Sequence, residues 1–376
     1  MIAAVPKETL AGETRVALTP DLVADVKKLG LEVMVESGAG EGSFASDTQY
    51  MDAGATIAKT ADELYEKAGM ILKVQKPTDA EIARMKPGTI LISFLWALSD
   101  PELVEKLKKA KVTALGMEAI PRITRAQSMD ALSSMSSLAG YKSVLIGAAN
   151  LGKYLPMMMT AAGTIRPSKV LILGAGVAGL QAIATARRLG AMVEAFDVRP
   201  AVKEQVESLG ARFVDVPLDD DTETKGGYAK ELSKDAQDRQ HEVIHKHVTA
   251  ADVVISTALI PGKKAPTLIT KAMVEDMVAG SVIVDLAAEQ GGNCEYTKAG
   301  EVVDVKGVSV HGPVNLPASM SIHASQMYAR NILALLKNMV KEGEPFFDMN
   351  DEITLYTTIT RDGEIVSPLL KPTMEA

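Results

Sequence analysis

The chain has 376 residues, of which 47% are hydrophobic and 23% charged, so it is long enough for two globular domains and too apolar for a disordered protein. Its 40 lysines and arginines are outnumbered by 48 aspartates and glutamates, and only 4% of the residues are aromatic. The net charge of −8 and the few rings argue against a nucleic-acid-binding surface, which needs cations for phosphates and rings for bases.

The single cysteine, Cys294, cannot form an internal disulfide, and residues Met1–Val5 read as a strand and not as a secretory signal. Both features favour a reducing cytoplasm. No uninterrupted apolar stretch reaches about 18 residues, which a membrane-spanning helix would need. We expect a chain that does not itself cross a membrane but could dock on a membrane partner.

Through the first 120 residues, short apolar runs alternate with helical patterns, which predicts βα units and a parallel sheet. This part reads as a complete doubly wound domain. Its predicted strands and helices are Met1–Val5, Pro20–Leu29, Glu32–Glu36, Ala61–Ala68, Met70–Val74, Thr89–Leu95 and Val112–Met117.

A helix of small residues, Asp130–Gly140, follows the polar loop Pro121–Met129. Small side chains permit close helix packing, and we expect this helix to cross into a second domain. The predicted fold is therefore α/β, with two Rossmann-like, doubly wound parallel-sheet domains joined by long helices and a cleft between them. Residues 1–132 and 320–376 form the first domain, and residues 133–319 form the second.

The second domain opens with Lys169–Leu173, an apolar strand that runs into the glycine turn Gly174-Ala175-Gly176-Val177-Ala178-Gly179. In a dinucleotide site the first glycine allows a tight turn, the second allows the pyrophosphate to approach, and the third allows helix and sheet to pack closely. The helix N-terminus supplies free N–H groups to the phosphates.

A second strand, Met192–Phe196, ends in Asp197, about the expected 20 residues beyond the turn. A carboxylate there accepts hydrogen bonds from a ribose 2′-OH and repels a 2′-phosphate, which favours NAD over NADP. Arg199 complicates this assignment, because an arginine could pair with a phosphate or cover the adenine. The carboxylate carries more weight.

Later runs read as strands and as a returning tail. The predicted strands are Arg212–Val216, Val253–Thr257, Val282–Leu286 and Val308–His311. In the tail, Met320–Met339 reads as an amphipathic helix, and Ile353–Ile359 with Glu364–Val366 reads as a hairpin. We expect this tail to complete the first domain.

The acidic, glycine-containing segment 218–233 has two interpretations. Gly226 and Gly227 could be hinges of a lid that carries Tyr228 over the cofactor, or the segment could be an unstructured surface insertion. Composition alone does not decide between them.

Two local patterns have simpler explanations. His241-Glu242-Val243-Ile244-His245 matches the zinc-protease motif, but it falls in a charged crossover helix with no plausible third ligand, so we predict a solvated helix face and no metal site. Met157-Met158-Met159 indicates adaptable core or interface packing.

Arg122, Gln127, Asp130 and Ser133 form a polar set at the domain junction. They could grip a nicotinamide carboxamide and its ribose, with Arg122 steadying the loop. Equally, Ser128 or Asp130 could simply cap the helix start. Both interpretations stay open on the residues alone.

Taken together, these segments resemble the NAD(H)-binding alpha component, domain I, of proton-translocating NAD(P) transhydrogenase, in the superfamily shared with alanine dehydrogenase. The resemblance covers nearly the whole chain. It rests on Arg15–Pro20, Pro121–Asp130, Met157–Thr164, Gly174–Gly179 and Thr257–Gly262.

The chain departs from the alanine dehydrogenase pattern at two positions. The resemblance places that family's catalytic lysine at Gln75 and its catalytic histidine at Trp96. Neither replacement carries a proton at neutral pH, whereas an amino-acid dehydrogenase needs such a group. Direct transfer between two nicotinamides needs only apposition of the rings.

The resemblance also implies residue roles. Arg122, Gln127, Asp130 and Ser133 would be the catalytic, nicotinamide-side residues, with Gln127 where a partner's NADP(H) ring approaches. Asp197, Val198 and Arg199 would hold the adenosine ribose, and Tyr228 would lie on a mobile loop. The full cofactor-binding set adds Ile123, Thr124, Ser128, Met129, Gly174, Gly176, Val177, Ala178, Gly179, Gly227, Gln240 and Leu259.

The implied function is hydride exchange between NADH on this chain and NADP+ on a beta component, of the Si-face-specific type. A membrane-spanning proton-channel component would couple this exchange to proton movement. The resemblance further implies a homodimer, peripheral on the cytoplasmic face of the inner membrane. Alternatives are a self-sufficient alanine-type dehydrogenase, with Glu289 or Lys73 as its acid or base, and a nucleotide-sensing module.

Overall fold

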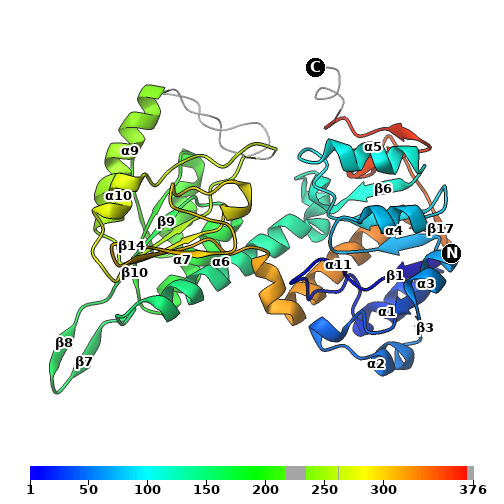
Figure 1. The fold of residues 1–376 in the computed structure, drawn as a ribbon, viewed down its shortest axis with the longest axis horizontal. Helices are drawn as coiled ribbons and strands as arrows, with labels where there is room; N and C mark the ends of the chain where they lie inside the picture. Colours follow the sequence, from blue (N-terminus) through cyan, green and yellow to red (C-terminus); the bar gives the residue numbers. More distant parts are fainter. Residues whose placement is uncertain (217–233, 261, 371–376) are drawn as a thin grey trace. The chain divides into compact units, whose positions relative to one another are not determined.

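A computed structural model describes residues 1–216, 234–260 and 262–370. The chain divides into two compact units, which are described separately (Figure 1). Unit 1 comprises Met1–Met135 and Pro317–Ala376, and unit 2 comprises Ser136–Leu316.

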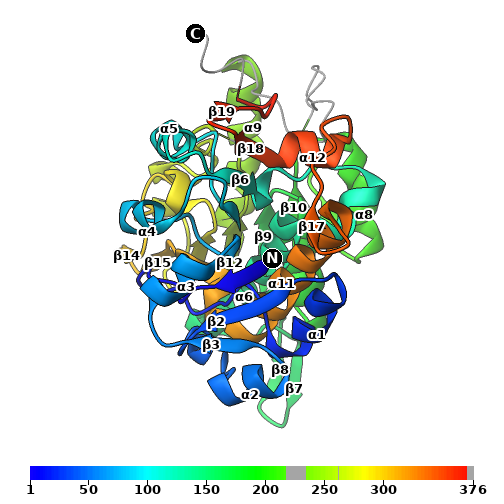
Figure 2. The same ribbon diagram turned by 90° about the vertical axis from the view of Figure 1, so that its right-hand side faces the viewer.

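Unit 1 is built on an eight-stranded sheet with the order β19-β18-β6-β5-β4-β1-β2-β3. Its six N-terminal strands are parallel. They are β1 (Ile2–Val5), β2 (Glu32–Glu36), β3 (Thr56–Ala58), β4 (Met70–Leu72), β5 (Ile90–Ser93) and β6 (Thr113–Gly116). The returning tail adds β18 (Thr358–Arg361), antiparallel to β6, and then β19 (Glu364–Ile365). The tail thus extends the sheet of unit 1, beyond β6 in Figure 2.

Helices cover both faces of this sheet. On one face lie α3 (Ala61–Lys67), α4 (Asp79–Arg84) and α5 (Pro101–Lys109), whose apolar side chains form a core with alternate strand residues. On the other, α1 (Pro20–Lys28) packs on α11 (Ser321–Met339) (Figure 2). The smaller elements of unit 1 are α2 (Asp47–Asp52), β16 (Val340–Lys341), β17 (Glu344–Pro345) and α12 (Glu352–Thr357).

The tail corrects one prediction. Ile353–Ile359 is not the first strand of a hairpin, because its first part folds as the helix α12 and only Thr358–Arg361 is a strand. The β-branched run favours a strand locally. However, Asp351 caps the helix by accepting the Thr354 N–H at 3.3 Å, and it is itself paired with Arg125. The cap and the burial of Ile353 and Thr357 thus stabilise a helix against the strand preference of the run.

Unit 2 has a seven-stranded sheet with the order β11-β10-β9-β12-β13-β15-β14. All neighbours are parallel except β14 and β15. The strands are β9 (Lys169–Leu173), β10 (Met192–Phe196), β11 (Arg212–Phe213), β12 (Val253–Ser256), β13 (Val282–Asp285), β14 (Val302–Val305) and β15 (Val308–His311). Two doubly wound parallel sheets are thereby confirmed, although β11 is shorter than predicted.

Strand residues of unit 2 alternate between two cores. Val170 and Ile172 pack with α7 (Val177–Arg188) and α8 (Lys203–Ser208), whereas Leu171 and Leu173 pack with α9 (Lys234–Thr249) and α10 (Lys271–Glu275). Because both faces are covered, these strands read as continuous apolar runs in the sequence.

The small-residue helix is α6 (Ala131–Asn150), which continues well beyond the predicted end at Gly140. A Cβ at Gly140 would lie 2.1 Å from the Ala178 carbonyl oxygen, and one at Gly147 would lie 2.7 Å from a Val253 methyl. Glycine is therefore required at both positions, and the predicted close packing of this helix is confirmed.

A two-stranded arm, β7 (Met158–Thr160) and β8 (Gly163–Ile165), extends away from the sheet of unit 2 (Figure 1). Met157 and Met159 are 58% and 75% exposed there. The core interpretation of the methionine run is therefore wrong, and interface packing is the one that remains. Within the described residues, no helix combines the length and apolarity needed to cross a bilayer.

Candidate functional site

The glycine turn of unit 2 joins β9 to α7 at the carboxyl edge of the sheet. Gly174 has a φ of +98°, which favours glycine, and a Cβ there would lie 2.6 Å from Thr257 Oγ1. A Cβ at Gly179 would lie 1.8 Å from the Gly174 carbonyl oxygen. Turn geometry and close helix–strand packing thus require glycine at these two positions.

Gly176 is different, because nothing in the protein itself requires it to be glycine. Its φ is −75°, and the nearest neighbouring atom to an added Cβ would be Arg199 Nη2 at 4.0 Å. Gly176 is also the N-cap of α7 and offers no side chain to cap the first turn. The turn therefore leaves open space beside free backbone N–H groups, as a bound phosphate requires.

Asp197 directly follows β10, and its carboxylate is directed at this turn. Its carboxylate accepts the Ala175 N–H at 2.7 Å and three hydrogen bonds from Arg199, each at 2.9 Å. The two side chains form an ion pair in which Asp197 is only 6% exposed. The structure thus brings Asp197 and Arg199 to the glycine turn, with Val198 between them.

A buried clamp that sequence reasoning missed shapes the neighbouring loop after β12. Asn293 accepts the Ala258 N–H at 3.0 Å and donates to the Ala258 carbonyl at 2.9 Å. Asp285, at the end of β13, holds Asn293 by accepting its N–H at 2.7 Å. Thr257 then donates to the Gly174 carbonyl at 3.1 Å. A polar residue ending an apolar run, Val282–Asp285, was the signal for this clamp.

The polar set of the predicted nicotinamide side lies in unit 1. The short 3₁₀ helix Thr124–Met129 leaves Gln127 exposed. Asp130 caps α6, because its carboxylate accepts the Ser133 N–H at 2.8 Å and the Ser133 hydroxyl at 2.6 Å. The capping interpretation is therefore correct for Asp130.

The remaining residues of that loop divide into exposed and buried ones. Arg122 and Thr124 are exposed, and Ile123 is half-buried. Met129 is buried, and the Ser128 carbonyl accepts a hydrogen bond from Asn331 on α11 at 2.8 Å. The loop is thereby anchored to α11 while its polar side chains face outward.

Gln75 and Trp96 have side chains that do not exchange a proton at neutral pH, and both side chains contact neighbouring residues. The Gln75 amide donates to Glu13 at 2.8 Å, and Glu13 pairs with Arg15 at 2.6 Å. Burial alone would raise the pKa of Glu13, but the bonds from Arg15 and Gln75 outweigh it and lower the pKa to about 2. The Trp96 indole stacks on Phe94 with ring centroids 5.3 Å apart.

Lys73, an alternative base, is locked in a buried charge cluster. Its ammonium lies 3.2 Å from Glu8 and 2.8 Å from Glu81, and its side chain is 1% exposed. Burial alone would lower the pKa of Lys73, but the two carboxylates outweigh it and raise the pKa. A lysine that stays protonated at neutral pH is no general base.

The other predicted cofactor residues lie on α9, in the loop after β12 and in the acidic segment. Gln240 is buried on α9, and Leu259 is exposed in the loop after β12. Gly227 and Tyr228, and with them the proposed lid, lie outside the described residues.

The two histidines of the HExxH segment lie on α9 but contact different partners. His241 lies 3.1 Å from the Thr267 carbonyl, and His245 lies 2.9 Å from Asp276. Among the residues that the structure describes, no cluster of histidine, cysteine and acidic side chains is arranged to hold a metal. Cys294 is buried, and burial raises its pKa to about 11, which leaves the thiol unreactive.

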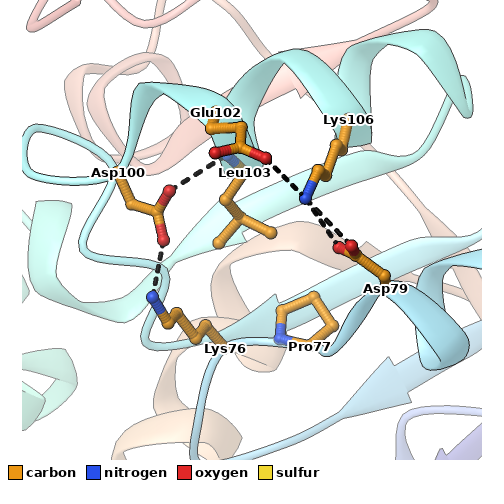
Figure 3. A pocket seen from close by; sticks show the side chains of 7 residues that line it. All are labelled: Lys76, Pro77, Asp79, Asp100, Glu102, Leu103 and Lys106. Atoms are coloured by element: carbon orange, nitrogen blue, oxygen red, sulfur yellow. Dashed lines mark hydrogen bonds and ion pairs between the residues drawn. The ribbon is translucent and has the colours of Figure 1, made fainter.

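A depression in unit 1 is lined by charged side chains that satisfy one another (Figure 3). Lys76 pairs with Asp100 at 2.5 Å, and Lys106 pairs with Asp79 and Glu102 at 2.9 and 2.8 Å. It contains none of the predicted site residues, and its self-paired charges leave little for a ligand.

Comparison with known proteins adds independent evidence. Residues 4–139 and 143–368 match the family models described as the N-terminal and C-terminal domains of alanine dehydrogenase/PNT. The chain is 49% identical to an NAD(P) transhydrogenase alpha-subunit chain of Rhodospirillum rubrum, over 98% of this chain and 99% of that protein.

Solved structures agree. A transhydrogenase from Sinorhizobium meliloti superposes with a TM-score of 0.88 at 43% identity, covering 97% of this chain and 100% of that one. An L-alanine dehydrogenase gives a TM-score of 0.82 at 28% identity, covering 100% and 99%. The chain therefore belongs to the alanine dehydrogenase/PNT family, and within it is more similar to these transhydrogenases than to that alanine dehydrogenase.

Proposed function

We propose that this chain binds NAD(H) at the glycine turn of unit 2 and exchanges hydride directly with NADP(H) bound to a partner component. The transfer runs between NADH and NADP+ and is of the Si-face-specific type. A membrane component couples it to proton translocation, so the chain acts peripherally at the cytoplasmic face of the inner membrane.

One observation carries this proposal over an amino-acid dehydrogenase. At the two positions where the alanine dehydrogenase pattern has a lysine and a histidine, this chain has Gln75 bonded to Glu13 and Trp96 stacked on Phe94. Neither can take up or release a proton. Hydride exchange between two nicotinamides moves no proton on a side chain, so it tolerates both replacements.

The nicotinamide-side roles are part of the same proposal. Gln127 is exposed on its 3₁₀ helix, as a residue that meets a partner's nicotinamide must be. Asp130 and Ser133 are hydrogen-bonded to each other at 2.6 Å, so they present one prearranged polar pair to the cofactor. Arg122 completes the set from the loop before them.

The decisive experiment mixes the purified chain with an NADP(H)-binding component, NADPH and an oxidised NAD analogue, and follows absorbance. We expect reduction of the analogue only when both proteins are present. No transfer at saturating concentrations contradicts the proposal. Turnover by this chain alone with NADH, ammonium and pyruvate supports the alanine-type dehydrogenase instead, and NADH binding without turnover in either assay supports a sensing module.

We further propose that the chain is a homodimer and that the β7–β8 arm is its contact. A two-stranded hairpin is marginally stable alone in water, so it needs a covering surface. Tyr154, Met157, Met159 and Ile165 are all exposed on or beside the arm. An apolar ribbon of this kind is a docking surface, and a second copy of the chain supplies the matching one.

Sedimentation of two variants tests this contact. Met159→Glu on the arm should shift the dimer towards monomer. Val302→Glu on the edge strand β14, a residue 61% exposed and far from the arm in sequence, should leave the dimer intact. Equal behaviour of the two variants would exclude the arm as the contact.

A further inference from the structure

The ion pair at the end of β10 has a consequence for which nucleotide unit 2 accepts. A lone carboxylate at this position would discriminate against NADP(H) by repelling its 2′-phosphate. Here the carboxylate is paired with Arg199, and the two formal charges cancel. Repulsion by Asp197 alone is therefore a weak explanation for selectivity.

The geometry of the Asp197–Arg199 pair suggests a different explanation for nucleotide selectivity. Arg199 directs Nε and Nη2 at the two carboxylate oxygens, both at 2.9 Å. This two-donor edge of a guanidinium also matches a phosphate, which accepts the same parallel pair of hydrogen bonds. The donors that a 2′-phosphate would use are those that Asp197 occupies.

The pair also lies where the adenosine ribose is expected. Asp197 accepts the Ala175 N–H of the glycine turn, and Arg199 Nη2 would be 4.0 Å from a Cβ at Gly176. A phosphate on the ribose beside Asp197 would be within reach of this guanidinium. Asp197 competes with such a phosphate for the two-donor edge of Arg199.

We propose that Arg199 is a latent 2′-phosphate-binding residue, and that Asp197 sets the preference for NAD(H) by holding it. When the negative charge of Asp197 is removed, the guanidinium of Arg199 binds the 2′-phosphate instead. The nucleotide preference of unit 2 then reverses from NAD(H) towards NADP(H). This inference rests on the proposed binding of NAD(H) at the glycine turn.

The test measures dissociation constants of NADH and NADPH by titration of nucleotide fluorescence. Asp197→Asn is the main variant, because its amide oxygen can still accept the Ala175 N–H while the charge is gone. We expect NADPH to bind about tenfold more tightly or better, the value of one charge-assisted hydrogen bond, while NADH binds more weakly. Asp197→Ser repeats the measurement should the amide disturb folding, which thermal melting reports.

Removal of the cation is the matched control. Arg199→Ala in the Asp197→Asn background should abolish the gain in NADPH affinity, whereas Arg199→Ala in the otherwise unchanged chain should alter NADPH affinity far less. This double-mutant cycle isolates the coupling between the two side chains.

The outcomes separate cleanly. If the unchanged chain binds NADH but neither Asp197 variant gains NADPH affinity, or if the gain survives Arg199→Ala, this inference is overturned and the proposed function stands. If the unchanged chain binds neither nucleotide, both this inference and the proposed function are contradicted. A gain that depends on Arg199 supports the inference.

Discussion

The two units share one strand order, but unit 2 leaves the turn at its reversal point open and unit 1 fills the corresponding place with side chains. Unit 1 has β3-β2-β1-β4-β5-β6 and unit 2 has β11-β10-β9-β12-β13-β15, so the order reverses at β1/β4 in one and at β9/β12 in the other. Such a reversal opens a crevice at the carboxyl ends of the strands, where ligands bind. In unit 2, Gly174 follows β9 there, and Gly176 beside it leaves open space.

Unit 1 fills the corresponding crevice with its own side chains. Glu8, just after β1, accepts the Val74 N–H after β4 at 2.6 Å and pairs with Lys73 at 3.2 Å. No glycine follows β1, where the sequence reads Pro6-Lys7-Glu8. The fold offers a site at both reversals, but only the turn without side chains leaves one open.

The largest effect should come from breaking the filled crevice. Lys73→Met leaves Glu8 and Glu81 buried without their cation, so we expect unit 1 to lose about 3–5 kcal/mol of stability in urea unfolding. Lys76→Met removes an exposed ion pair with Asp100 and should cost less than about 1 kcal/mol. Similar losses of unfolding free energy in the two variants would mean that the buried Lys73 cluster does not stabilise unit 1 more than an exposed ion pair does.

The pH dependence of unfolding tests how strongly a second buried carboxylate of unit 1, Glu13, stabilises this unit. Its folded-state pKa of about 2 lies below the ordinary 4.5, so its stabilisation is complete above about pH 4.5 and is lost as pH falls towards 2. The shift in pKa corresponds to about 3 kcal/mol of unfolding free energy, which is present at neutral pH and absent at low pH. The stability gap between the unchanged chain and Glu13→Gln should therefore narrow from pH 5 to pH 2; a gap independent of pH would refute the assignment.

Two glycine substitutions in unit 2 distinguish a glycine that is needed for packing within the protein from one that leaves space for a ligand. Gly179→Ala forces a Cβ against the Gly174 carbonyl at 1.8 Å and should cost about 1–3 kcal/mol of stability. Gly176→Ala meets no close protein atom and should leave the melting temperature unchanged while weakening NADH about tenfold or more, since a methyl group then occupies the space left for the phosphates. Unaltered NADH affinity in Gly176→Ala would place the cofactor elsewhere.

The smallest change in stability is expected at Gln127→Asn. This side chain is exposed, so both melting temperature and NADH affinity should stay nearly constant. Hydride transfer to the partner's nucleotide should slow, because the shorter amide no longer reaches the approaching ring. Stopped-flow transfer rates alongside NADH titrations check this, and equal losses of affinity and rate would contradict the role.

Much of this architecture could be predicted from local sequence. Strands such as Lys169–Leu173 and Met192–Phe196 have the predicted bounds, because buried parallel strands are continuous apolar runs between turn residues. The helix α12 was predicted wrongly, because its β-branched run favours a strand, whereas the Asp351 cap and the burial of side chains on one face stabilise a helix. The Asp285–Asn293 clamp was also missed, since a polar residue at the end of an apolar run does not reveal which distant residue it will hold.

By itself, the sequence determined the glycine turn and the acidic residue after the second strand, since each depends on residue type at a local position. It also has Gln75 and Trp96 at the positions where the resemblance to alanine dehydrogenases implies proton-carrying side chains. Tertiary structure alone decided that Glu8 meets Lys73 and that Arg199 is held by Asp197 instead of left for a ligand. These contacts depend on where separate strand ends and side-chain rotamers meet in space, which no periodicity along the chain encodes.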